Sequence, residues 1–193
     1  MGEKKKKLLL GMTGTIASLN IFHYLNVFKE SYDIKIIMTR AATKFINPNG
    51  LRPLVESVHT SLFDMKDIRV PHVNLLEDID KFLILPTTAN FLAKIANGMA
   101  DDLLSACVLN YNKPIFLAPN MNPTMWSKSS VQRNVKILKE DGFIFLNKTA
   151  SGLEASSGKR VVSDAALPSA NSILYSLFKD EESRNSLSLQ FES

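Results

Sequence analysis

The sequence has little of several residue types, and each shortage excludes a class of protein. Of its 193 residues, one is a cysteine and three are histidines. A single thiol, Cys107, cannot form a disulfide within the chain, which is typical of proteins from a reducing compartment. The His, Cys, Asp and Glu residues do not cluster at the spacing of metal ligands, so we expect no metal site.

Long apolar runs are also absent. No segment approaches the ~20 apolar residues of a membrane span. The apolar run that follows the lysines at 4–7 is too short for a secretory signal, so we expect a cytoplasmic protein. The net charge of +4 owes much to this lysine run, which we interpret as a solvated tail. We therefore predict neither a nucleic acid nor a membrane as partner.

What the sequence does have is an alternation of short apolar runs and helical patterns. Apolar runs without strict alternation are typical of strands that are covered on both faces of a parallel sheet. They lie at residues 7–12, 34–39, 82–86 and 114–119, with a shorter one at 143–146. Helical patterns lie between them at 16–32, at 90–111, where we expect two helices separated by a break at Gly98, and at 131–142. This order predicts a single-domain α/β protein with an open, doubly wound parallel sheet.

The C-terminal part of the chain is less regular. Residues 147–166 show little periodicity and form a longer connection than is usual, so we predict a lid or a disordered segment there. The pattern at 168–178 predicts a closing helix. We assign residues 1–179 to the folded domain and residues 180–193 to a flexible tail.

Three of the predicted strands end in neutral polar residues. These ends read "GMTGTIAS" (11–18), "PTTAN" (86–90) and "APNMN" (118–122). Ligands of such sheets bind beyond the carboxyl ends of the strands, and the lack of charged residues predicts a planar, hydrogen-bonding cofactor. The first segment is neither a dinucleotide fingerprint nor a P-loop, and no serine-hydrolase elbow is present. Thr15 and Thr88 are also natural helix caps, which is the structural alternative.

The same segments resemble a known family, the homo-oligomeric flavin-containing cysteine decarboxylases. The resemblance is carried by "GMTGTIAS", by "PTTANFLAKIANGMADDLLS" and above all by "PNMNPTMW" (119–126), which matches the pattern P-x-M-N-x-x-M-W at every fixed position. It extends from about residue 7 to about residue 165. It implies a Rossmann-like, flavodoxin-like flavoprotein fold.

The resemblance also implies site residues and partners. It implies a catalytic histidine, matched by His72 in "HVNL", and an Asn122 that binds the substrate carboxylate, with Met125 also in the substrate site. It implies trimers, in some members assembled into dodecamers, in which neighbouring subunits contribute the flavin and His72. We favour FMN over FAD because no motif reads an adenine. The implied flavin-binding residues are Gly14, Thr15, Thr39, Thr88, Ala89, Asn90 and Asn120.

The implied reaction follows from the chemistry of cysteine. Oxidation of the Cα–Cβ–S unit to a thioaldehyde places a C=S group β to the carboxylate, where it accepts the electrons left by CO2. A base must also remove a proton, and an imidazole suits this task, so we assign the role to His72. The neutral amide of Asn122 would orient the carboxylate without stabilising its ground-state charge.

Two branches of the family differ in one cysteine. The coenzyme A branch carries a cysteine in an A-C-G loop, which reduces the enethiol, whereas the corresponding residues 151–160 have none. Cys107 lies in an apolar helical pattern, where we expect an inert buried thiol. Residues 153–160 resemble the substrate clamp of the peptide-modifying, lanthipeptide-type branch. We therefore predict oxidative decarboxylation of the C-terminal cysteine of a ribosomally made precursor peptide to an aminoenethiol.

Other functions of the same fold stay open at this point. One alternative is a phosphopantothenoylcysteine decarboxylase of coenzyme A biosynthesis, and another is a flavin prenyltransferase. A third is a non-catalytic subunit that binds flavin and regulates a partner.

Overall fold

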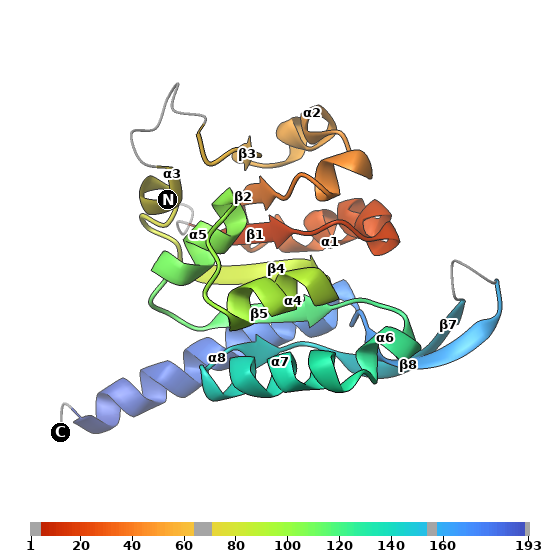
Figure 1. Ribbon diagram of the computed structural model, residues 1–193. Helices are drawn as coiled ribbons and strands as arrows, with labels where there is room; N and C mark the ends of the chain where they lie inside the picture. The colour runs from red at the N-terminus through yellow and green to blue at the C-terminus, as the bar shows by residue number, and fades with distance from the viewer. Residues whose placement is uncertain (1–4, 64–70, 154–157, 192–193) are drawn as a thin grey trace.

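The central element is a parallel sheet of six strands. The computed structural model describes residues 5–63, 71–153 and 158–191. The strands follow the order β3-β2-β1-β4-β5-β6, and all neighbours pair in parallel (Figure 1). This architecture confirms the predicted doubly wound α/β fold. The strands are β1 (Lys6–Met12), β2 (Tyr32–Met38), β3 (Ser57–His59), β4 (Lys81–Thr87), β5 (Ile115–Pro119) and β6 (Ile144–Phe145).

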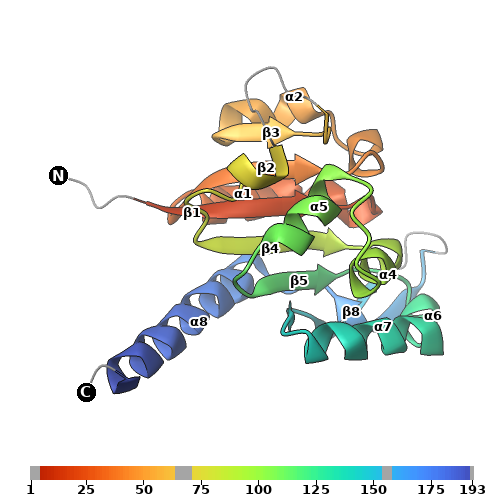
Figure 2. The same cartoon turned by 60° about the vertical axis from the view of Figure 1, so that its left-hand side comes forward.

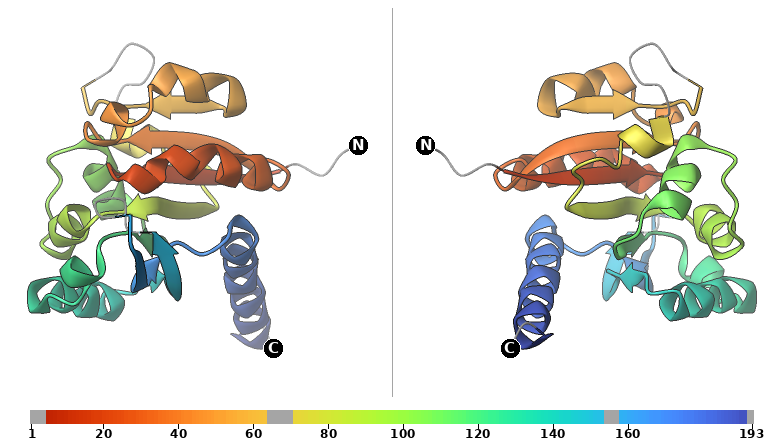
Figure 3. Two further views of the ribbon diagram at one scale, coloured as in Figure 1. Left: turned by 90° about the vertical axis from the view of Figure 1, so that its right-hand side faces the viewer. Right: turned by 90° about the vertical axis from the view of Figure 1, so that its left-hand side faces the viewer.

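Helices cover both faces of the sheet, as Figure 3 shows from two sides. On one face, α1 (Ile21–Phe28) and α8 (Ala170–Phe191) pack over side chains such as Leu8 and Leu10. On the other face, α4 (Ala89–Ala96), α5 (Leu103–Asn110) and α7 (Ser129–Glu140) pack over side chains such as Leu9. Neighbouring residues of one strand therefore enter opposite cores, which explains why the strands are continuously apolar. The short helical segments are η1 (Ile16–Asn20), η2 (Ala42–Lys44), α2 (Pro48–Leu51), η3 (Arg52–Leu54), α3 (Pro71–Asn74) and α6 (Pro123–Trp126).

The predicted strands and helices differ from the structure at a few places. The edge strand β3 was missed because only Val58 of its three residues is buried, which leaves no apolar run to detect. By contrast, the predicted break at Gly98 is confirmed: the pattern at 90–111 divides into α4 and α5 next to Gly98, which has a positive φ of 65°.

Part of the predicted lid forms a β-hairpin. Strand β7 (Lys148–Leu153) pairs antiparallel with β8 (Arg160–Ala166), and the hairpin projects from the end of the molecule where α6 lies (Figure 1). Of the two alternatives predicted for 147–166, disorder is therefore wrong for the residues of the two strands, and the lid stays a prediction. Along β8, half-buried residues alternate with exposed ones, but small and polar side chains hide this alternation in the sequence. Residues 154–157 of the lid lie outside the described residues.

Helix α8 is longer than the sequence pattern predicted. The pattern ended at residue 178, but the helix continues to Phe191 and extends beyond the sheet (Figure 2). The predicted end was wrong because residues 170–191 contain no glycine or proline, and polarity alone does not stop a helix. Its first half is anchored to β4 by an ion pair of 2.7 Å between Lys81 Nζ and Asp180 Oδ2. In the described part of the chain, no helix combines the length and the apolar character that crossing a bilayer requires.

Candidate functional site

Hydrogen bonds between the strand ends hold three loops side by side. The Thr13 hydroxyl donates to the Pro86 carbonyl over 2.7 Å and accepts from the Thr88 N–H over 3.0 Å, which joins the ends of β1 and β4. The Asn120 N–H donates to the Thr87 carbonyl over 3.0 Å, which joins the ends of β4 and β5. The three neutral segments singled out in the sequence therefore form one surface.

Gly14 allows the loop after β1 to pack closely against the segment that follows β2. A Cβ atom at this position would lie 2.6 Å from Ala41 Cβ and 2.7 Å from the Ala41 carbonyl carbon. Backbone cannot yield as a flexible side chain can, so a larger residue would displace the loop. Gly14 is required by this close approach and not by an unusual backbone angle.

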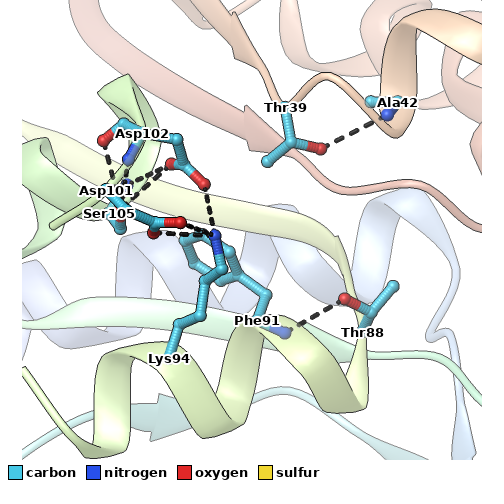
Figure 4. A network of polar contacts seen from close by, with 8 residues as sticks. All are labelled: Thr39, Ala42, Thr88, Phe91, Lys94, Asp101, Asp102 and Ser105. Atoms are coloured by element: carbon cyan, nitrogen blue, oxygen red, sulfur yellow. Dashed lines mark hydrogen bonds and ion pairs between the residues drawn. The ribbon is translucent and has the colours of Figure 1, made fainter. Parts of the chain in front are cut away.

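Three threonine hydroxyls cap the turns that begin at these strand ends. Thr88 accepts a hydrogen bond from the Phe91 N–H over 3.2 Å at the start of α4, and Thr39 accepts from the Ala42 N–H over 3.3 Å (Figure 4). Thr15 accepts from the Ala17 N–H over 2.9 Å and donates to Asn120 Oδ1 over 3.2 Å. The structural alternative, helix capping, thus holds for both Thr15 and Thr88, whether or not they also bind a ligand.

The strand ends and the hairpin enclose a cavity of about 730 Å³. This volume lies within the ~300–1,000 Å³ that is usual for small-molecule and cofactor sites. None of the lining side chains is charged. The lining residues are Gly14, Thr15, Ile16, Ala17, Leu19, Asn20, Thr88, Ala89, Asn120, Met121, Asn122, Pro123, Met125, Ala150, Ser151, Val161, Ser163, Ala165 and Ala166.

Most of the residues implied by the resemblance meet at this cavity. Thr39 and Asn90 do not line it: the Thr39 hydroxyl faces the turn at Ala42, and Asn90 is exposed on the first turn of α4. Sequence reasoning missed the hairpin residues. Half-buried or buried side chains at 161, 163 and 165 alternate with exposed ones along β8, and this period of two was the available signal. The implied residues that the cavity brings together are Gly14, Thr15, Thr88, Ala89, Asn120, Asn122 and Met125.

Asn122 lies where β5 leads into α6. Its Oδ1 accepts a hydrogen bond from the Thr124 N–H over 2.8 Å, which caps the short helix. This hydrogen bond fixes the position of the Asn122 amide at the wall of the cavity.

His72 lies elsewhere in the chain. It belongs to α3, which packs against α5 and lies at the opposite end of the sheet from the hairpin (Figure 1). The described residues offer no hydrogen-bond partner to its Nδ1, which is buried. One copy of the chain therefore does not bring His72 and Asn122 together.

Cys107 is buried on α5, beneath α3. Burial, with a smaller contribution from the charge of Asp102, raises the pKa of the Cys107 thiol to about 12. Its Sγ lies 3.9 Å from the His72 carbonyl oxygen. A buried thiol with such a pKa is not a nucleophile or a reductant at neutral pH, which confirms the expectation of an inert cysteine.

The "ANGMADDLLS" segment is structural. Lys94 donates to Asp101 over 2.7 Å and to Asp102 over 3.1 Å, and Asp102 caps α5 (Figure 4). The hydrogen bond from Lys94 holds the pKa of the Asp101 carboxyl below its ordinary value. These charges fix the turn between α4 and α5 and do not reach the cavity. Within the described residues, no group of three His, Cys, Asp or Glu could hold a metal ion.

Comparisons with known proteins agree with this architecture. The model of the Flavoprotein family matches residues 2–177. The epidermin decarboxylase of Staphylococcus epidermidis is 32% identical over 179 residues, which cover 91% of this chain and 96% of that protein. The coenzyme A biosynthesis bifunctional protein CoaBC of Borreliella burgdorferi is 33% identical over 157 residues, which cover 80% of this chain and 40% of that longer protein.

A solved structure is similar along nearly its whole length. A histidine-to-asparagine variant of EpiD, in complex with the substrate peptide DSYTC, is 30% identical to this chain and superposes with a TM-score of 0.79. The match covers 91% of this chain and 99% of that one. On the family match and these similarities, the chain belongs to the Flavoprotein family.

Proposed function

We propose that this protein is a flavin-dependent decarboxylase of peptides that end in cysteine. The product is an aminoenethiol at the C-terminus of a ribosomally made precursor peptide. The observation that carries the proposal is the uncharged cavity that the three strand ends and the hairpin enclose, with three asparagine amides in its lining. Similarity to the epidermin decarboxylase supports the same reaction class.

The cavity fits a flavin mononucleotide in size and in chemistry. Hydroxyl and amide groups of the lining match a flavin's many hydrogen-bonding atoms, and apolar residues such as Ile16 and Met121 match its planar rings. The residues that would surround it are Gly14, Thr15, Thr88, Ala89 and Asn120. When bound, it supplies the two-electron oxidation that turns the cysteine Cα–Cβ–S unit into a thioaldehyde.

Asn122 orients the carboxylate that leaves. Its amide is held in place by the hydrogen bond from the Thr124 N–H, and an amide can donate to a carboxylate, which is an acceptor. A neutral donor fixes the direction of the C–C bond that breaks but does not hold the full ground-state charge. An arginine would stabilise the carboxylate more than a transition state from which that charge is departing.

His72 would take a proton from the substrate cysteine, and this role requires a second copy of the chain. In one copy, α3 and the hairpin lie at opposite ends of the sheet (Figure 1). We therefore propose a homo-oligomer, a trimer or an assembly of trimers up to a dodecamer, in which His72 of one copy completes the cavity of the next. Thr39 and Asn90 do not line the cavity of their own copy, so they would contact only a flavin that is bound in a neighbouring copy.

A peptide substrate is favoured over the coenzyme A precursor by the missing reductant. Residues 151–160 contain no cysteine, and the thiol of Cys107 is buried on α5 with a raised pKa. Reduction of the enethiol therefore has no donor in the described residues, and the reaction ends there. The hairpin β7–β8 lines the cavity and would act as a lid over the peptide. We place the reaction in the cytoplasm, where the substrate thiol stays reduced.

Mass spectrometry tests this proposal. A library of short peptides that all end in cysteine is incubated with the purified yellow protein, and we expect members to lose about 46 Da, the mass of CO2 and two hydrogens. The same peptides with a C-terminal amide, or with serine in place of cysteine, should stay unchanged. Conversion of phosphopantothenoylcysteine to 4′-phosphopantetheine, with every peptide untouched, would assign the protein to the coenzyme A branch.

A further inference from the structure

Two threonine hydroxyls that line the cavity differ in how their hydrogen atoms are used. The Thr15 oxygen accepts from the Ala17 N–H over 2.9 Å, and its hydroxyl donates to Asn120 Oδ1 over 3.2 Å. A hydroxyl has one hydrogen, so Thr15 has none left for a ligand. The Thr88 oxygen accepts from the Phe91 N–H over 3.2 Å, but its hydroxyl donates to no described residue. Thr88 can therefore donate into the cavity, and Thr15 cannot.

The bond from Thr15 decides which end of the Asn120 amide faces a ligand. Asn120 is half-buried, and its backbone N–H is tied to the Thr87 carbonyl over 3.0 Å, so its position is fixed. Because Oδ1 accepts from Thr15, the NH2 group is the one that remains for the cavity. Without Thr15, the amide could rotate by half a turn and present its oxygen instead.

We propose that Thr15 is a positioning residue and not a hydrogen-bond donor to the flavin. It orients the Asn120 amide so that the NH2 group donates to an acceptor atom of the flavin, while Thr88 supplies a second, independent donor. This inference rests on the flavin site of the proposed function. It predicts that Thr15 affects flavin affinity only through Asn120.

A double-mutant cycle tests the dependence of one residue on the other. The dissociation constant of FMN is measured from the recovery of flavin fluorescence when the purified holoprotein is diluted. We expect Thr15→Val and Asn120→Ala each to weaken binding about tenfold, the effect of one hydrogen bond. The double variant should bind no more weakly than Asn120→Ala alone, because Thr15 has then nothing left to orient.

Two further variants separate this effect from a loss of helix capping. Thr15→Ser keeps both hydrogen bonds and should bind FMN as the parent does. Thr88→Val also removes a cap, but its effect should add to that of Thr15→Val, since Thr88 acts independently. Thermal unfolding of each variant shows whether the fold is retained.

The polarity of the amide is tested by Asn120→Asp. This change keeps an acceptor for Thr15 but replaces the NH2 donor with a second acceptor, so FMN should bind more weakly than to Asn120→Ala. Asn49→Asp adds the same charge at an exposed asparagine outside the cavity and should change binding less than twofold. Equal losses in these two variants would mean that charge alone is responsible and would overturn the proposal.

Additive effects of Thr15→Val and Asn120→Ala, about hundredfold together, would also overturn it, because Thr15 would then contact the flavin directly. The proposed function fails separately. If the parent protein binds no flavin, the site itself is wrong; if it binds FMN and decarboxylates peptides but the cycle is additive, only the role of Thr15 is wrong.

Discussion

At the scale of single residues, the side chains that build the loops of the site also line its cavity. Thr15 and Thr88 each cap a short helical segment or helix and also line the cavity, so the capping interpretation is confirmed and the ligand-binding interpretation stays a prediction. Sequence reasoning placed them correctly because strand ends meet at one edge of a parallel sheet. It did not predict that Thr39 lies outside the cavity. Which strand-end loops reach the cavity depends on how the loops pack, here on the contact between Gly14 and Ala41.

The neutrality of Asn122 gives a prediction of its own. Asn122→Asp keeps the helix cap on α6, since a carboxylate accepts from the Thr124 N–H as well as an amide does. It replaces the NH2 donor with a negative charge that repels the substrate carboxylate. We expect kcat for peptide decarboxylation to fall about 100-fold or more, as when an active-site donor is removed, with flavin content unchanged. A variant with more than half of the parent activity would remove Asn122 from the reaction.

Cys107 predicts a pH dependence. A rise of its pKa from the ordinary 9.0 to about 12 lowers the thiolate fraction near pH 8 about 1,000-fold. Burial keeps the thiol protonated in the folded state. The contribution of this thiol to the stability of the fold is therefore complete below pH 9 and is lost as the pH rises from 9 towards 12. We expect a maleimide to label the native protein at pH 8 far more slowly than the protein in urea. Equal rates in both states would contradict the buried, inert thiol.

At the scale of elements, the sequence pattern located the strands that helices cover on both faces of the sheet. It missed the edge strand β3 and the strands of the hairpin. Strands β1, β2, β4 and β5 are continuous apolar runs, and all were predicted. Strand β3 and the hairpin β7–β8 have few large apolar residues, and their pairing depends on partners that lie elsewhere in the fold. The end of α8 was missed for another reason: no residue in it stops a helix.

The hairpin can be tested as a lid with two neighbouring valines. Val161 lines the cavity, whereas Val162 points away from it and is 63% exposed. Val161→Glu places a charge where a bound peptide would exclude water, so we expect KM for the peptide to rise about tenfold or more. Val162→Glu carries the same charge on the outer face and should leave KM within a factor of two. Similar KM values for both variants would show that the hairpin does not cover the peptide.

At the scale of the whole molecule, the proposal of a shared site depends on distances that the sequence does not record. The resemblance implied a site shared between subunits, and the fold supports it by separating α3 from the hairpin. Such separation follows from the order of the strands and from the side of the sheet on which each connection lies. Neither composition nor local pattern records these distances, so His72 and Asn122 could be named from motifs but not placed.

Complementation of two inactive variants tests the shared site. His72→Asn and Asn122→Asp are each expected to be nearly inactive, but mixed oligomers of the two contain sites with both native residues. With random assembly at equal amounts, about one quarter of the sites combine His72 of one copy with Asn122 of another. We expect decarboxylation to recover to about that fraction. Co-expression of His72→Asn with the double variant should give no recovery, and the absence of recovery in the first mixture would contradict the shared site.

The central claim, that a flavin in this cavity oxidises the C-terminal cysteine of a peptide, is tested most directly by the colour of the protein. The purified protein is mixed without oxygen with a peptide that ends in cysteine, and the yellow absorbance of the oxidised flavin is followed. We predict one flavin bleached for each peptide decarboxylated, with the colour restored by air. A colourless protein, or decarboxylation that leaves the flavin oxidised throughout, would contradict the account.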